Sequence, residues 1–162
     1  KFDPGDESIT FIGDTHTNGF RWCKGVLCHD GCIYCMPSCA AQILKIDVIN
    51  QTTCLVGPII HTSPDFFEAE LGRDGYIYAT FCNRPPVINV RSIVYQQILK
   101  FNPKDKTIQN IGNTLDCSRT NWKGSSIAKN QNIYYMPTMF TKFILCIHVP
   151  PSDCVLYTPY FR

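Results

Sequence analysis

Four closely spaced cysteines are the first group in this sequence that could do chemistry: Cys28, Cys32, Cys35 and Cys39. Thiolates are strong zinc ligands, and a pair separated by two residues, such as Cys32 and Cys35, has the spacing found in many zinc sites. The chain has no second such pair to complete four ligands. A metal site is therefore one hypothesis. The others are buried structural cysteines and a disulfide or redox use, for which Cys28 and Cys32 are best placed across a turn.

Two histidines and two glutamates are the residues that could act as acids or bases. His16 and His61 occupy related positions in two sequence repeats, so they could form a paired site for a metal or for proton transfer. Glu68 and Glu70 would share one face of a strand, because side chains alternate along a strand. The alternative to catalysis is that the histidines are exposed in loops and that the carboxylates face solvent. No serine nucleophile motif, phosphate loop or dinucleotide fingerprint occurs.

An insertion of about residues 82 to 94, reading CNRPPVINVRSIV, is the strongest candidate for binding a partner. It lengthens the connection between two predicted strands of one repeat, and its two prolines cannot continue a central strand. Insertions in repeat folds tend to lie on one face, which is often the binding face. The residues expected to contact a protein partner are Arg84, Pro85, Pro86 and Arg91.

The candidate residues are positioned by a sequence unit that recurs along the chain. Ile43 to Gly57 reads ILKIDVINQTTCLVG, and Ile98 to Gly112 reads ILKFNPKDKTIQNIG. A shortened copy runs from Lys1 to Gly13, and a degenerate copy runs from Ile144 to Thr158. Self-similarity at a fixed period is the signature of a repeat architecture.

Other segments recur between these copies. Gly31 to Pro37 matches Gly75 to Phe81 and Gln131 to Pro137, and a tryptophan segment precedes the first and third of them, at Trp22 and Trp122. All these segments are short, rich in β-branched and aromatic residues, and bounded by turn signals such as Asp-Gly. No segment shows sustained helical periodicity. Each repeat therefore predicts four antiparallel strands.

The Ile-Tyr-x-x-Pro and Ile-Leu-x-Ile-Asp patterns of these segments resemble the blades of Kelch-like β-propellers. The resemblance covers nearly the whole chain and implies an all-β, β-propeller portion in a single domain, residues 1–162. Residues 1–14 would give the last two strands of one blade. Three complete four-stranded blades would follow at residues 15–58, 59–113 and 114–162.

Three blades do not close a ring, because propellers typically have 4 to 8. A stack of repeats leaves apolar faces bare where a neighbour is missing. We therefore expect the ring to be completed by sequence beyond these residues or by another chain, for example in a two-fold pairing of two such halves.

Composition limits the class of partner. Apolar residues make up 44% and charged residues 17%, which predicts a folded core. The net charge is +2 without any cluster of Lys or Arg, so neither nucleic acid nor an anionic membrane surface is expected as a partner. No apolar run is long enough for a membrane span. Ten cysteines are compatible with disulfides or with reduced thiols, so the compartment stays open.

Three functions follow from these patterns. The first is a non-catalytic interaction or assembly scaffold without a cofactor, which binds a protein partner or further copies of itself. The second is a lyase or hydrolase with a site in the propeller channel, using His16, His61 or Glu68. The third is a metal-binding protein using the cysteines. Propellers carry many functions, so the fold does not choose among them.

Overall fold

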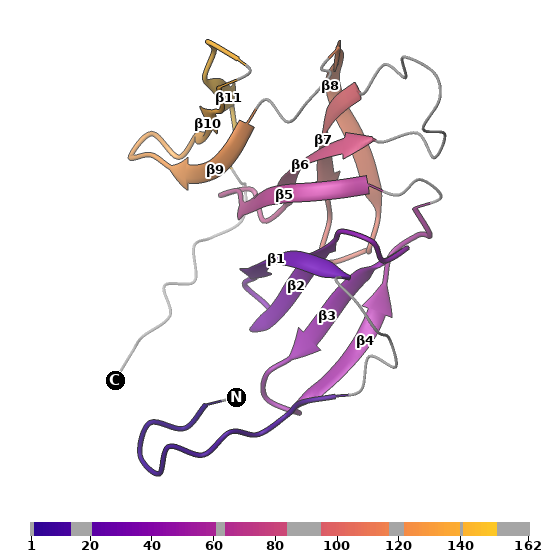
Figure 1. The fold of residues 1–162 in the computed structure, drawn as a ribbon, viewed down its shortest axis with the longest axis vertical. Helices are drawn as coiled ribbons and strands as arrows, with labels where there is room; N and C mark the ends of the chain where they lie inside the picture. Colours follow the sequence, from indigo (N-terminus) through magenta and orange to yellow (C-terminus); the bar gives the residue numbers. More distant parts are fainter. Residues whose placement is uncertain are drawn as a thin grey trace.

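The protein is described from a computed structural model that covers residues 2–13, 21–60, 64–83, 95–116, 122–139 and 141–151. These residues form three antiparallel sheets and no helix (Figure 1). The first sheet contains, in spatial order, β1 (Trp22–Leu27), β2 (Cys32–Pro37), β3 (Ile43–Asp47) and β4 (Thr52–Val56). The second contains β5 (Pro64–Leu71), β6 (Ile77–Asn83), β7 (Tyr95–Phe101) and β8 (Ile108–Asp116). The third contains β9 (Trp122–Ile127), β10 (Ile133–Pro137) and β11 (Leu145–Ile147).

The expected all-β class and the antiparallel order within each sheet are confirmed. Consecutive strands pair in all three sheets, as short turns require. The fourth strand expected in the third sheet would lie beyond Pro151, outside the described residues. At the other end of the chain, Phe2 and Ile9 form a single antiparallel bridge rather than two full strands.

The turn between the first two strands has the same conformation in all three sheets. In the first sheet it runs from Cys28 to Gly31, where the Gly31 amide donates to the Cys28 carbonyl over 3.0 Å. The last turn residue has a positive φ in each case, 76° at Gly31, 81° at Gly75 and 63° at Gln131. Glycine adopts this conformation freely, so the third sheet uses a less suitable residue at the same position.

Every sheet has two distinct faces, which the strand register defines. The second strand of each sheet (β2, β6 or β10, called the β2-type strand) shows the two faces. Its tyrosine, Tyr34, Tyr78 or Tyr134, lies on the front face, and the isoleucine just before it, such as Ile77, lies on the back face. The front of the first sheet packs on the back of the second, where the rings of Tyr34 and Phe101 lie 5.5 Å apart. The front of the second sheet packs on the back of the third in the same way.

The protein core therefore lies in two interfaces between sheets. The first interface buries, among others, Tyr34, Met36, Ile77 and Phe101. The second interface buries, among others, Tyr78, Trp122, Ile133, Tyr135 and Val149. The first strands of the sheets also lie side by side, with β5 in contact with β1 and with β9 (Figure 1). This arrangement aligns β1, β5 and β9 along one side of the stack.

Candidate functional site

Each turn before a β2-type strand supplies a side chain that hydrogen bonds to the tyrosine four residues later. The Tyr34 and Tyr78 hydroxyls donate to the carboxylates of Asp30 and Asp74, both over 2.7 Å. In the third sheet, the Asn130 amide donates to the Tyr134 hydroxyl over 2.9 Å. The Oδ1 atom of each turn residue accepts a hydrogen bond from the backbone N–H two residues on, which fixes the side chain.

The first interface adds a lysine to this pair. Lys106, from the turn between β7 and β8, donates to the Tyr34 hydroxyl over 2.8 Å and also to the carbonyl of Pro103. Burial and the hydrogen bond to Asp30 both raise the pKa of Tyr34 well above its ordinary value. The hydroxyl therefore stays protonated and joins the first sheet to the second.

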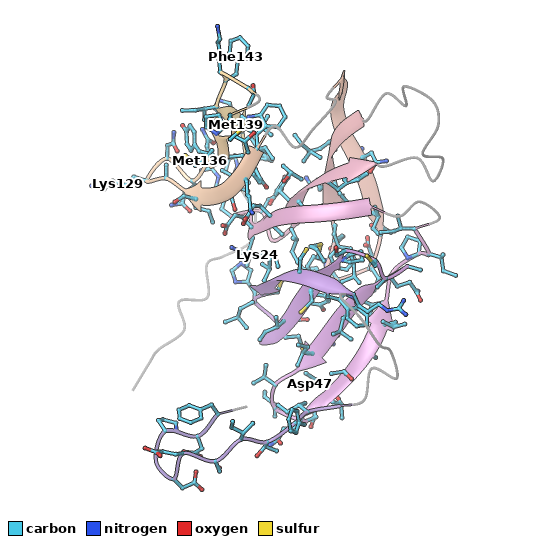
Figure 2. All side chains as sticks on the ribbon, in the orientation of Figure 1. Lys24, Asp47, Lys129, Met136, Met139 and Phe143 are labelled. Carbon is cyan, nitrogen blue, oxygen red and sulfur yellow. The ribbon has the colours of Figure 1, made fainter. Side chains whose placement is uncertain are left out.

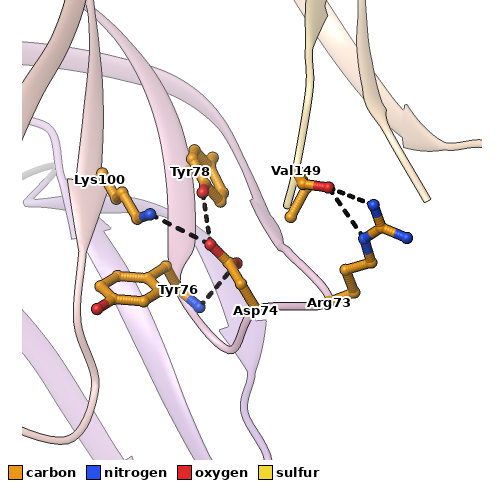
Figure 3. A network of polar contacts seen from close by, with 6 residues as sticks. All are labelled: Arg73, Asp74, Tyr76, Tyr78, Lys100 and Val149. Atoms are coloured by element: carbon orange, nitrogen blue, oxygen red, sulfur yellow. Dashed lines mark hydrogen bonds and ion pairs between the residues drawn. The ribbon is translucent and has the colours of Figure 1, made fainter. Parts of the chain in front are cut away.

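The second interface has a related network (Figure 3). The Lys100 ammonium lies 3.2 Å from the Asp74 carboxylate and 3.9 Å from the centre of the Tyr76 ring. Burial, then the hydrogen bond to Asp74, raises the pKa of Tyr78 to about 12. Next to this network, the Arg73 guanidinium donates two hydrogen bonds, of 2.9 and 2.6 Å, to the Val149 carbonyl of the third sheet.

These two networks have the chemistry of structural links. Each one contains an acid, a base and a hydroxyl, as many active sites do. However, the Asp74 carboxylate is occupied by three donors, from Tyr76, Tyr78 and Lys100, and its side chain is only 8% exposed. We therefore interpret both networks as structural. The first network links two sheets, because Lys106 of the second sheet bonds Tyr34 of the first. The second network fixes the turn and strands of the second sheet, and the adjacent Arg73 makes the link to the third sheet.

The candidate carboxylate Glu68 lies in a row of polar side chains from the three first strands. Lys24 of β1 lies 3.5 Å from Glu68 and 3.9 Å from Glu70, both on β5. Ser125 of β9 donates to Glu70 over 2.8 Å. Glu68 and Glu70 lie on the same face of β5, as the alternation predicted. The carboxylates bind an ammonium and a hydroxyl from adjacent sheets, so the row bridges all three sheets. The catalytic role of Glu68 stays a prediction.

The cysteine cluster does not converge on one point. Cys32 is buried on the front face of β2, whereas Cys35 is partly exposed on the back face, and Cys39 is exposed beyond the strand. Cys28 is buried, and burial raises the pKa of its thiol to about 12. Among the described residues, no group of three or more His, Cys, Asp and Glu side chains is arranged to hold a metal ion.

A shallow pocket lies where the turns of the first and second sheets meet. It has a volume of about 280 Å³ and is lined by Cys28, His29, Asp30, Gly75, Pro103, Lys104 and Lys106. Lys106 is already engaged by Tyr34 and Pro103, so this cation is committed to the interface.

The remaining predicted site residues lie outside the described part of the chain. They are His16 and His61, proposed for catalysis, and Arg84, Pro85, Pro86 and Arg91, proposed for binding. No helix in the described ranges is long and apolar enough to cross a membrane.

Neither a protein-family model nor a curated protein matches this chain. The resemblance to Kelch-like propellers therefore stays a prediction from the sequence patterns. Sequence reasoning missed the links between turn residue and tyrosine, although a signal for them exists. An Asp or Asn stands four residues before the tyrosine in all three repeats, at Asp30, Asp74 and Asn130.

Proposed function

We propose that this chain is a non-catalytic interaction and assembly scaffold, whose sheets are blades of a β-propeller portion and whose two end faces bind protein. The observation that carries the proposal is a contrast at equivalent positions. Met36 and Thr80, on the front faces of the first two sheets, are buried, whereas Met136 on the front of the third sheet is 41% exposed. Contiguous exposed apolar patches mark interaction surfaces, and Met136 would belong to such a patch on this face.

The opposite end of the stack shows the same contrast. On the back faces, Ile77 and Ile133 are buried, whereas Ile33 of the first sheet is partly exposed. Leu27 and Leu55 share that face and are 62% and 54% exposed. The two ends of the stack thus present the kind of surface that is buried inside it.

The blade arrangement is supported by how the sheets stack. They are packed front to back, with their first strands adjacent, as blades are around a central channel. In this proposal β1, β5 and β9 are the inner strands, and the row of Lys24 and Glu68 faces the channel. The insertion of residues 82 to 94 would supply a further contact with a protein partner.

A catalytic site at the row of Lys24 and Glu68 is the second candidate, because side chains from three sheets meet there. The test is a screen of the purified chain for hydrolase and lyase activity, with Glu68→Gln as the matched control. An activity that the native chain has and the variant lacks would replace the scaffold proposal.

The scaffold proposal is tested by whether the end faces are open in the folded chain. At low protein concentration, we expect the folded chain to bind the fluorescent dye anilinonaphthalene sulfonate. Leu55→Glu and Met136→Glu should each weaken the fluorescence, whereas Ile59→Glu, at an exposed apolar residue outside both faces, should leave it unchanged. Near-ultraviolet circular dichroism would check that each variant is folded. A folded chain without dye fluorescence would overturn the proposal.

A further inference from the structure

We propose that the protein that binds these end faces is a second copy of the chain, docked head to tail. The front face of the third sheet of one copy would pack on the back face of the first sheet of the next. This inference rests on the proposed function, because it names the partner of the end faces.

The contact already exists twice within one chain. Tyr34 of the first front face packs against Phe101 of the second back face, and Tyr78 of the second front face packs against Ile133 and Tyr135 of the third back face. The Tyr135 hydroxyl also donates to the Tyr78 carbonyl over 2.9 Å. The faces left over are one front and one back, so a second copy offers the complement of each.

The residues of the two free faces suit such a contact. The back of the first sheet presents aliphatic and thiol groups, namely Leu27, Ile33, Cys35, Ile46 and Leu55, around Leu44, which is already buried. The front of the third sheet presents Tyr134, Met136 and Cys146. The N-terminal segment of residues 2–13 lies near the lower ends of β3 and β4 (Figure 1), where Gly13 lies against Thr53 on the back face, and it leaves Leu55 of β4 more than half exposed. An apolar surface remains open at both ends.

The turn after the third strand of each sheet (β3, β7 or β11) shows most directly that, among the described residues, the first sheet has no preceding sheet against it. Val48, Pro103 and Val149 occupy equivalent positions in the three sequence repeats. Pro103 is buried and Val149 is only 1% exposed, because in each case the preceding sheet covers the turn. Val48 of the first sheet is 47% exposed. A third sheet from a second copy would cover Val48 as the second sheet covers Val149.

Lys129 of the third sheet could make a polar contact with the same turn of a second copy. Arg73, in the turn of the second sheet, donates to the Val149 carbonyl, and its equivalent in the third sheet is Lys129. Lys129 is exposed at the far edge of the third sheet (Figure 2). In the head-to-tail contact, Lys129 would donate to the Val48 carbonyl of the next copy, beside the negative charge of Asp47. The opposite charges of Lys129 and Asp47 therefore support the same docking position as the two apolar faces.

The contact is heterologous, because it joins two different surfaces. Two copies related by a two-fold axis would make it twice and form a ring of about six blades, within the range of known propellers. Each front face would then have a back face against it.

The first experiment measures the mass of the native chain by light scattering over a concentration series. We expect the mass to rise from 18.4 kDa toward twice that value as concentration increases. Met136→Glu, on the front face, and Leu55→Glu, on the back face, should each stay at the mass of one copy. Ile59→Glu should assemble like the native chain. A native chain that stays at the mass of one copy at every concentration overturns the inference.

Mixing the two variants tests the direction of the contact. Met136→Glu keeps an intact back face, and Leu55→Glu keeps an intact front face. The mixture should therefore form dimers with one intact interface, although neither variant dimerises alone. A contact between two equal faces would instead leave one variant able to dimerise alone and would overturn the head-to-tail inference.

The alkylation rates of native cysteines provide a second measure of whether the two faces are covered on assembly. We expect alkylation of Cys146 on the front face and Cys35 on the back face to slow about tenfold at assembling concentrations, because the contact limits access to both thiols. Cys39 and Cys54, exposed elsewhere, are the internal controls. Unchanged rates at Cys146 and Cys35 in an assembled sample would overturn the proposed contact.

The two proposals fail in different ways. A single copy that binds the dye at every concentration would refute self-association and would keep the scaffold proposal, with a different protein as the partner. A folded single copy that binds no dye would refute both.

Discussion

The second sheet and the third sheet place similar residues in opposite environments. Tyr78 is buried between two sheets, whereas Tyr134, at the same position of its repeat, is partly exposed on a free face. The Asp74 side chain is only 8% exposed and also pairs with Lys100, whereas its equivalent Asn130 is exposed and, among the described residues, bonds only Tyr134 and the Asn132 amide. The difference in the exposure of the two tyrosines comes from the neighbouring sheet, because the turn and its hydrogen bond to the tyrosine are the same in both.

This comparison shows how the energy of the fold is distributed. In a stack of repeats, stability is approximately the sum of each unit and of the contacts between neighbours. The second sheet takes part in two such contacts, and the first and third sheets each take part in one. Substitutions in the second sheet should therefore cost more than the matched substitutions on the free faces.

The largest effect is expected for Phe101→Ala. Phe101 is fully buried and packs against Tyr34 in the first interface, so the substitution should lower the free energy of unfolding by about 3–5 kcal/mol. Met136→Ala, on the free face of the third sheet, should cost less than about 1 kcal/mol at low concentration. Urea denaturation measures both. Equal losses would contradict the difference between covered and free faces.

Asp74→Ala should have the next largest effect. It removes the partner of the Tyr78 hydroxyl and of Lys100 in a nearly buried position, so we expect a loss of about 2–4 kcal/mol. Asn130→Ala removes the equivalent exposed side chain and should cost about 1 kcal/mol or less. Thermal and urea unfolding measure the loss in each variant, and a loss in Asn130→Ala as large as that in Asp74→Ala would contradict this prediction.

Alkaline pH should act on the same buried network. A tyrosine in the unfolded chain ionises near pH 10, whereas burial raises the pKa of Tyr78 to about 12 in the folded protein. Between these values the folded state keeps a proton that the unfolded state has released, so stability falls as the pH rises through this window. Tyr78→Phe should reduce this loss. Identical pH dependence in both proteins, measured from urea midpoints, would contradict the role of Tyr78.

The smallest effect is expected at the turn between the first two strands, which has the same conformation in each of the three sheets. Gln131 has a φ of 63°, where the other sheets have glycine, so Gln131→Gly should raise stability by up to about 1 kcal/mol. The reverse change, Gly75→Gln, should lower it by about 1–2 kcal/mol. Scanning calorimetry of both variants tests whether the turns are equivalent. A loss of stability in Gln131→Gly would mean that the side chain contributes more than the backbone strain costs.

Much of the local fold could be predicted from the sequence. The matching segments that begin at Gly31, Gly75 and Gln131 predicted equivalent strands, which are β2, β6 and β10. Short turns then set the antiparallel order, because two strands joined by a few residues can only pair as a hairpin. Alternation also predicted that Glu68 and Glu70 share one face. By the same rule, Cys32 and Cys35 lie on opposite faces of β2.

The contacts between sheets could not be predicted in this way. Lys106 reaches Tyr34, and Arg73 reaches the Val149 carbonyl, across gaps of more than 70 residues in the chain. Such contacts depend on the angle and offset at which two sheets stack, and strand periodicity contains no information about either. The same limit applies to Lys24, which shares the two carboxylates of β5 only because β1 and β5 are adjacent.

The consecutive pairing of strands within each sheet has a consequence for how the protein folds. Every strand pair in the described residues joins strands that are neighbours in sequence, so a sheet can form from its own repeat alone. Folding rates rise as contact order falls, and local hairpins form without closing long loops. Each repeat can therefore form its sheet as it leaves the ribosome, and the next repeat then docks on an interface that is already in place.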